Sequence, residues 1–290
     1  MSPISWSSRP ELRRPVVVTA FEGWNDAGDA ASSAARWLIE RQDAIRVGTI
    51  DCEEFYDFTE TRPLVSYDED GRRQIEWPDV EIWAGSISDQ QDLVVLIGQE
   101  PHLRWRTFTE AVLQVVNELD ASLVLTLGAL LSDIPHTRPS VVTGTTDDPR
   151  TAARLDLAHS TYEGPTGIVG VLAATLRASG LATASLWASV PTYVSGAPSP
   201  KATLALIQRT CDLLDFRPAT TDLEIASAAY ERQLDELVAA DEDTAAYVAG
   251  LEEAADDQPA DEDPGAGHPP LTEADPAELV QEVERFLRGD

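Results

Sequence analysis

The chain has 290 residues and a formal net charge of −30, of which residues 219–290 carry −18. Such an acidic surface repels phosphate backbones and anionic lipids, so we expect no nucleic-acid partner and no membrane partner. No apolar run approaches the roughly 20 residues that cross a bilayer, and residues 1–14 do not resemble a signal peptide. The sequence therefore predicts a soluble, cytoplasmic protein.

Short apolar runs alternate with helix-forming segments along the first 218 residues. The predicted strands are 15–20, 44–50, 80–84 (an edge strand), 93–98, 123–128, 141–144 and 183–190. The predicted helices are 30–41, 105–119, 166–179 and 199–214. Residues 62–67 and 72–77 flank an acidic turn and predict a β-hairpin. Residues 51–60 and 129–150 are otherwise irregular.

Several of these runs are continuously apolar, as in Leu93–Gly98, which is typical of parallel strands buried on both faces. Strands of this kind separated by helices predict a three-layer α/β/α fold with a mostly parallel sheet and an inserted β-hairpin. We expect residues 1–218 to form this core.

The chain beyond the core changes character. Apolar residues at helical spacing predict a helical extension over 219–252 that packs on the core: Leu223, Ala226, Tyr230, Leu234 and Leu237. Residues 253–274 are acidic and rich in proline and glycine, which predicts a flexible linker. Asp275, Pro276 and Glu278 then begin a predicted terminal amphipathic helix, 275–290.

The sequence lacks the motifs of the common enzyme classes. It contains no P-loop, no dinucleotide-binding glycine motif, no nucleophile elbow and no metal-binding pair of histidines. Lys201 is the only lysine, which argues against a nucleotide-dependent ligase. Cys52 and Cys211 lie in dissimilar contexts, and we expect free thiols rather than a disulfide. We expect no metal and no cofactor, and the sequence favours a non-enzyme over an enzyme.

Four polar loops follow predicted strands or precede predicted helices, where α/β proteins usually bind ligands. We expect at least the first three to emerge on one side of the sheet and to share a pocket. Their candidate residues are Glu22, Trp24, Asn25, Asp26 and Asp29; Glu100, His102 and Arg104; His136, Thr137 and Arg138; and Tyr162, Gly164, Thr166 and Gly167.

Each candidate also has a structural interpretation. Asn25 or Asp26 suits a helix cap, and residues 164–167 suit a rigid turn as well as an anion cradle. Glu100 can pair with Arg104, and the indoles of Trp24 and Trp105 can pack rather than stack on a ligand. His102 and His136 are the candidate proton shuttles.

The order and spacing of six segments carry a resemblance to a known family. These segments are 21–31, 98–105 with Phe108, 135–139, 162–168 with Gly170, 190–194 and 198–202. Together they resemble the bacterial, mainly actinobacterial, branch of the proteasome assembly chaperone family, the second-subunit type, over residues 15–251. Tyr193 joins the candidates through this resemblance. Thr192 departs from it, because a histidine is expected there.

The resemblance implies a phosphorylase- or hydrolase-like core, a helical extension and homo-oligomers, for which we expect a trimer. It implies no settled activity. The first hypothesis is a non-catalytic assembly-chaperone-like or protein-interaction protein, with the terminal helix as one docking element. The alternative is a hydrolase or transferase acting on a small nucleoside-like or carboxylate ligand. An ATP-dependent carboxylate–amine ligase, the label of some relatives, ranks below both.

Overall fold

The structure is a computed structural model, and it describes residues 2–257 apart from residues 69 and 195. The predicted terminal helix and most of the predicted linker lie outside the described residues. Residues 253–257, predicted as the start of the linker, are instead the end of helix α7 (Glu242–Asp257). Alanine and glutamate in this stretch are good helix formers, which explains the extra turn.

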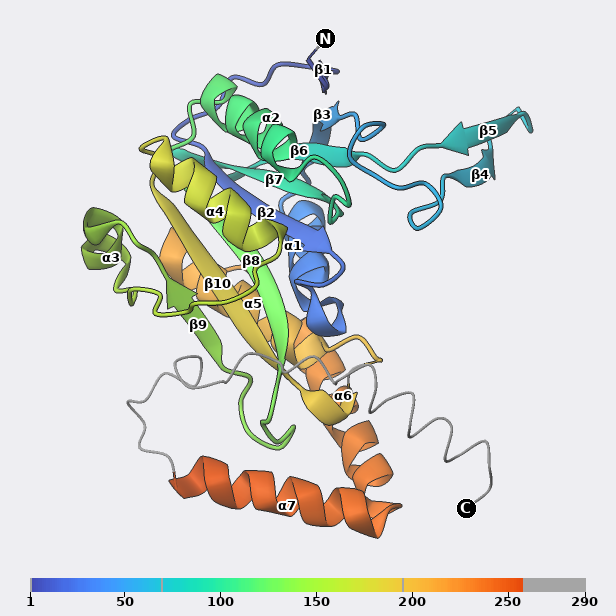
Figure 1. The fold of residues 1–290 in the computed structure, drawn as a ribbon, viewed down its shortest axis with the longest axis vertical. Coiled ribbons are helices and arrows are strands. Elements are labelled where there is room, and N and C mark those ends of the chain that lie inside the picture. The colour runs from blue at the N-terminus through green and yellow to red at the C-terminus, as the bar shows by residue number, and fades with distance from the viewer. Residues whose placement is uncertain (1, 69, 195, 258–290) are drawn as a thin grey trace.

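An eight-stranded sheet forms the centre of the molecule, in the order β1-β3-β6-β7-β2-β8-β10-β9 (Figure 1). Its strands are β1 (Ile4–Trp6), β2 (Val16–Glu22), β3 (Ile45–Ile50), β6 (Val80–Ser88), β7 (Gln91–Gln99), β8 (Leu123–Ser132), β9 (Val142–Thr145) and β10 (Thr183–Pro191). The neighbours β7, β2, β8 and β10 run parallel, and antiparallel strands extend the sheet on both sides.

The four parallel strands contain the continuous apolar runs, and nearly all their residues are buried. This confirms the predicted three-layer fold. One strand prediction was wrong: β6 lies inside the sheet, between β3 and β7, rather than at an edge. The short strand β1 pairs with β3 and takes the edge position instead. Strand β1 was missed because it has only three residues.

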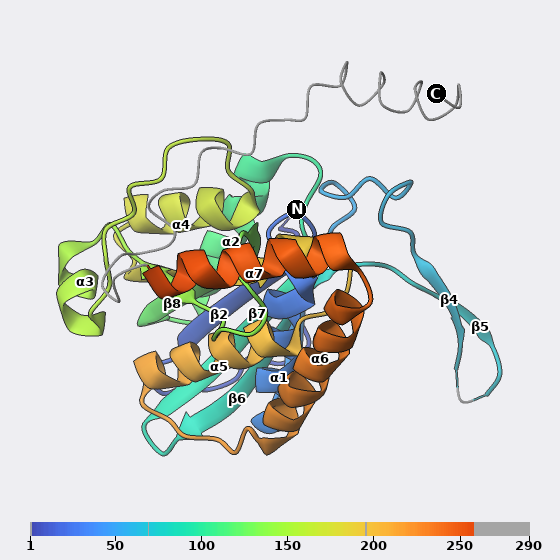
Figure 2. The same cartoon turned by 90° about the horizontal axis from the view of Figure 1, so that it is seen from below.

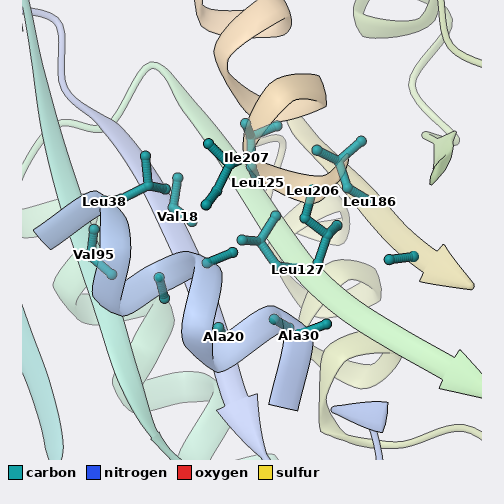
Figure 3. Close-up of a cluster of buried hydrophobic side chains, with 14 of the residues drawn as sticks. Val18, Ala20, Ala30, Leu38, Val95, Leu125, Leu127, Leu186, Leu206 and Ile207 are labelled. Atoms are coloured by element: carbon teal, nitrogen blue, oxygen red, sulfur yellow. The ribbon is translucent and has the colours of Figure 1, made fainter. Parts of the chain in front are cut away.

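Helices cover both faces of the sheet (Figure 2). They are α1 (Ala30–Arg41), α2 (Trp105–Glu118), α3 (Pro149–Leu155), α4 (Ile168–Ala178), α5 (Pro200–Leu214), α6 (Thr221–Ala239) and α7. Helices α1 and α5 bury one apolar cluster against the sheet, which includes Val18, Leu125 and Ile207 (Figure 3). Helices α2 and α4 bury a second cluster on the opposite face. Helix α3, which begins at the end of the stretch expected to be irregular, was not predicted.

The helical extension continues from α5. Helix α6 packs on α5 through Tyr230 and Leu234, which are both buried. Leu237, predicted on the same face, is 66% exposed, because α6 extends past the end of the core at that point. Helix α7 packs on α6 and bonds residues that follow β8 and β10, namely Thr137, Arg138 and Thr192. Among the described residues, no helix combines the length and apolarity needed to cross a membrane.

The inserted hairpin stands apart from the sheet. Strands β4 (Leu64–Tyr67) and β5 (Arg73–Glu76) pair only with each other, and both views show them projecting away from the core. The hairpin exposes large apolar side chains, namely Leu64, Val65, Tyr67, Ile75 and Trp77. Phe58 packs on Trp77 at the stem, but neither strand pairs with a third strand within the described residues, so most of this apolar surface is open.

Candidate functional site

Glu100, at the end of β7, fills the N-terminus of α4. Its Oε1 accepts hydrogen bonds from the backbone N–H of Ile168 at 2.8 Å and from Asn25 Nδ2 at 2.7 Å. A Cβ on Gly167 would lie 2.2 Å from Asn25 Nδ2, so this close approach requires glycine. The helix start that could have cradled an anion therefore already holds a carboxylate of the chain itself. We call Asn25, Glu100, Gly167 and Ile168 the α4 cap.

Asp26 performs the equivalent task for α1. Its Oδ1 accepts hydrogen bonds from the backbone N–H groups of Ala31 at 2.6 Å and Ser32 at 3.2 Å. Asp29, which directly precedes the helix in left-handed conformation, makes no such side-chain bond. Burial raises the pKa of Asp26, and the hydrogen bonds from Ser32 and Ala31 oppose that rise. The predicted capping role of this loop is what the geometry shows.

An open groove lies beside the α4 cap, at the carboxyl ends of β2 and β7. Its volume is about 280 Å³, and we call it the Trp24 groove. The lining residues are Glu22, Gly23, Trp24, Gln99, Glu100, Pro101, His102 and Trp105. Trp24 is 62% exposed, whereas Trp105 is half-buried and donates its indole N–H to the carbonyl of Pro101.

Two polar side chains near this groove have partners of their own. Arg104 pairs with Glu54 rather than with Glu100. His102 Nδ1 accepts the backbone N–H of Asp57 at 3.2 Å. Arg104 precedes α2 in left-handed conformation, and its side chain reaches Glu54 in the irregular 51–60 segment. The predicted Glu100–Arg104 pair is therefore absent, because each member has another partner within the described residues.

The third loop lies away from the Trp24 groove and packs against the helical extension. His136 is 2% exposed, and its Nδ1 lies 2.7 Å from the hydroxyl of Tyr193 while Nε2 lies 3.1 Å from Asp235 on α6. The same hydroxyl accepts the backbone N–H of His136 at 2.7 Å. Burial raises the pKa of Tyr193 to about 12, so its O–H remains available to donate to Nδ1. Lys201 donates to the carbonyl of His136 and pairs with Glu231.

We call this cluster, His136, Tyr193, Lys201, Glu231 and Asp235, the α6 junction. The cavity beside it holds about 10 Å³, which is no more than about one water molecule. Helix α7 covers the neighbouring residues: Arg138 pairs with both oxygens of Asp256, and Thr137 bonds Glu252. Every polar atom of the imidazole therefore has a partner from the chain.

The structure thus places the candidate residues in two groups rather than in one shared pocket. Glu22, Trp24, Glu100 and His102 line the Trp24 groove, while His136, Thr137, Arg138 and Tyr193 lie at the α6 junction or under α7. The fourth loop contributes Gly167 to the α4 cap, and exposed Tyr162 folds back to bond the carbonyl of Pro165. Among the residues described, no three His, Cys, Asp or Glu side chains group as metal ligands would.

Comparisons with known proteins agree with this architecture. A sequence model described as the PAC2 family matches residues 20–238. The chain belongs to the PAC2 family. A PAC2 family protein from Streptomyces avermitilis is 45% identical with a TM-score of 0.76, over 81% of this chain and 99% of the other. A proteasome-assembly chaperone homologue from Mycobacterium tuberculosis is 42% identical with a TM-score of 0.72, over 80% and 99%.

A more distant likeness shows the fold alone. Pyrococcus furiosus PbaA, an archaeal homologue of proteasome-assembly chaperone, is 17% identical with a TM-score of 0.59, over 87% of this chain and 100% of that chain. The comparison with curated proteins gave no match. The family match therefore begins near the end of β2 and runs almost to the end of α6, and both candidate groups lie within it.

Sequence reasoning missed three residues that complete these groups. Gln99 bonds Glu22 in the groove wall, and Glu231 and Asp235 come from α6. The two acids lie among many others on an acidic helix, so nothing in the sequence singles them out. Lys201 did carry a signal, because it is the only lysine in the chain.

Proposed function

We propose that the chain is a non-catalytic, assembly-chaperone-like protein that acts by binding other proteins. One observation carries the proposal: the side chains best suited to chemistry are occupied by the chain itself. His136 is closed in by Tyr193 and Asp235, and Asp26 and Glu100 each hold a helix start. Catalysis by these groups would need them to leave buried hydrogen bonds, at about 1–3 kcal/mol for each polar group left unpaired.

The projecting β4–β5 hairpin also supports a protein-binding role. It presents exposed apolar side chains at a distance from the core, on two strands without further strand partners among the described residues. Exposed patches of this kind usually mark protein-binding surfaces. The family similarity supports an assembly role, since the Mycobacterium tuberculosis relative bears the name of a proteasome-assembly chaperone homologue.

Assembly of a proteasome from its separate subunits is therefore the first test. The α and β subunits of the source organism are mixed with and without the full chain, and assembly intermediates are followed on native gels. We expect the chain to co-migrate with an intermediate and to be absent from the finished particle. A chain that binds no subunit and leaves the assembly rate unchanged would contradict a proteasomal role.

We also propose a homo-oligomer, with a trimer as the expected state, in the cytoplasm. Light scattering behind a sizing column measures the mass of the full chain against the 31.5 kDa of one copy. Removing residues 260–290 separates subunit docking by the terminal segment from oligomerisation by the rest of the chain. If the terminal segment is the docking element, truncation abolishes subunit binding and leaves the oligomer intact.

The alternative, a hydrolase or transferase on a small nucleoside-like or carboxylate ligand, has one observation in its favour. The Trp24 groove lies at the carboxyl ends of parallel strands, where such ligands commonly bind. A thermal-shift screen with nucleosides, nucleotides, phosphate and simple carboxylates tests it. Ligand at about 100 times its dissociation constant adds about 2.7 kcal/mol of stability, and an unmoved melting curve would argue against this function.

A further inference from the structure

The Trp24 groove combines an open aromatic surface with a carboxylate that is only half used. Glu100 Oε1 accepts two hydrogen bonds, but Glu100 Oε2 has no hydrogen-bond partner among the described residues. Trp24 exposes most of its side chain at the same groove, and its indole N–H has no hydrogen-bond partner in the described part of the chain. These are the groups that remain free to meet a ligand.

The charges around the groove favour a cation. Glu22 lines it and is balanced by Arg36, which leaves Glu100 without a basic neighbour among the lining residues that the structure describes. The imidazole of His102 is the other titratable group in the lining. The chain as a whole has a net charge of −30, so its field concentrates cations at the surface and repels phosphates and carboxylates. Nucleotides and anionic substrates are therefore poor fits.

The groove is large enough to hold one planar side chain. Its volume of about 280 Å³ lies just below the roughly 300–1,000 Å³ of typical small-molecule sites. A planar guanidinium can stack on an indole and donate hydrogen bonds to a carboxylate at the same time, which an ammonium group cannot do as well. The free oxygen of Glu100 and the exposed face of Trp24 provide both partners.

We propose that the Trp24 groove binds an arginine side chain of a partner protein, with Glu100 as its carboxylate and Trp24 as its stacking surface. The proposal deepens the proposed function, because it rests on the chain being a protein-binding protein. It assigns the groove to a basic segment of the partner and leaves the apolar hairpin as a separate surface.

Fluorine NMR of the full chain labelled with 5-fluorotryptophan tests this directly. Trp24 is assigned by the resonance that disappears in Trp24→Phe, and Trp77, exposed on the stem of the hairpin, serves as the internal control and is assigned in the same way with Trp77→Phe. The probe is N-acetyl-arginine amide, raised to about 50 mM because one side chain binds weakly. N-acetyl-citrulline amide, which has almost the same shape and no charge, is the matched ligand control.

We expect the Trp24 resonance to shift along a saturating curve with the arginine probe and the Trp77 resonance to stay nearly still. Citrulline should bind about fivefold more weakly, equivalent to about 1 kcal/mol. Glu100→Gln keeps an acceptor for the α4 cap and removes the charge, so it should weaken arginine binding by a similar factor. Equal shifts at both tryptophans, equal binding of citrulline, or no shift at all would overturn the proposal.

Further measurements distinguish a failure of the arginine site from a failure of the proposed protein-binding function. If adenosine shifts Trp24 more than the arginine probe does, the groove is a small-ligand site and the proposal is wrong. If Trp24→Ala assembles proteasome subunits as well as the native chain does, protein binding stands and the arginine site is wrong. If the arginine probe binds but no subunit does, the site stands and the assembly role is wrong.

Discussion

The Trp24 groove and the α6 junction begin from the same kind of sequence. Each is a polar loop at the carboxyl end of a parallel strand, and each contains an acid, an imidazole and a basic side chain nearby. One remains an open groove of about 280 Å³, and the other is closed to about 10 Å³. The difference is that side chains of α6 and α7 bond the loop that follows β8, whereas the groove at the ends of β2 and β7 stays open among the described residues.

Residue type and strand position therefore do not suffice to make a site. His136 looked like a proton shuttle and became a structural contact once Asp235 and Tyr193 were placed on it. Trp24 looked like a packing residue and is instead exposed. A loop can meet a ligand only if no later part of the chain covers it.

The largest expected effect concerns the α4 cap, beside the groove. Gly167→Ala should lower the free energy of unfolding by about 3 kcal/mol, because the new Cβ would lie 2.2 Å from the buried Asn25 amide. Moving that amide would break its bond to Glu100. Chemical denaturation measures the change, and Gly196→Ala is the control, because the added Cβ would meet no non-neighbouring atom within 4 Å among the described residues. Equal stabilities would show that the α4 cap is loosely packed.

At the α6 junction, Tyr193→Phe should cost about 2 kcal/mol. Removing the hydroxyl leaves the His136 backbone N–H and Nδ1 without their partner in a buried position. Tyr162→Phe is the matched control, because that hydroxyl bonds the carbonyl of Pro165 at the surface, and it should cost less than about 0.5 kcal/mol. Similar losses in the two variants would mean that the junction is not closed in solution.

A smaller, pH-dependent effect is expected where α6 begins. The indole N–H of Trp37 bonds Asp222 at 2.9 Å and, together with Arg41, holds the pKa of that carboxyl below its usual value. A lowered folded-state pKa stabilises the fold above the unfolded value of about 3.9, and the gain is lost as the pH falls through the folded-state value. At pH 7, Asp222→Asn should therefore lose about 0.5 kcal/mol, as expected for exposed pairs.

This loss should shrink as unfolding is measured at falling pH, from about pH 5 to below about pH 3, because the native carboxyl becomes protonated there. Glu236→Gln changes an exposed acid on the same helix and is the control for the loss of one negative charge. A difference between Asp222→Asn and the native chain that stays constant over this range would show that the carboxylate charge plays no part in holding α6 to α1.

The smallest effect is expected on the open side. Trp24→Ala should change the free energy of unfolding by less than about 0.5 kcal/mol, because the indole is largely exposed. Trp37→Ala is the contrasting variant, since that indole is buried and bonded to Asp222, and it should cost about 3 kcal/mol. A large loss for Trp24→Ala would mean that a partner copy covers the groove in solution.

Much of the fold could be predicted because its signals are local. The apolar runs of β2, β7, β8 and β10 and the periodic helices α1, α2 and α5 each lie within one stretch of chain. The errors occurred where distant pairing decides: β1 exists through β3, and β6 is internal because β1 and β3 continue the sheet beyond it. Asp26 and Glu100 were found as candidates, but their partners at α1 and α4 were only partly visible.

By itself, the sequence determined the alternation of strands and helices, the four polar loops and the acidic character of the chain, because each depends on residues close together along the chain. Only the tertiary structure decided which loop is open. That outcome depends on how α6 and α7 meet the loop that follows β8, through contacts such as His136 with Asp235 and Arg138 with Asp256. These residues are about 100 or more positions apart, so no local pattern encodes their meeting.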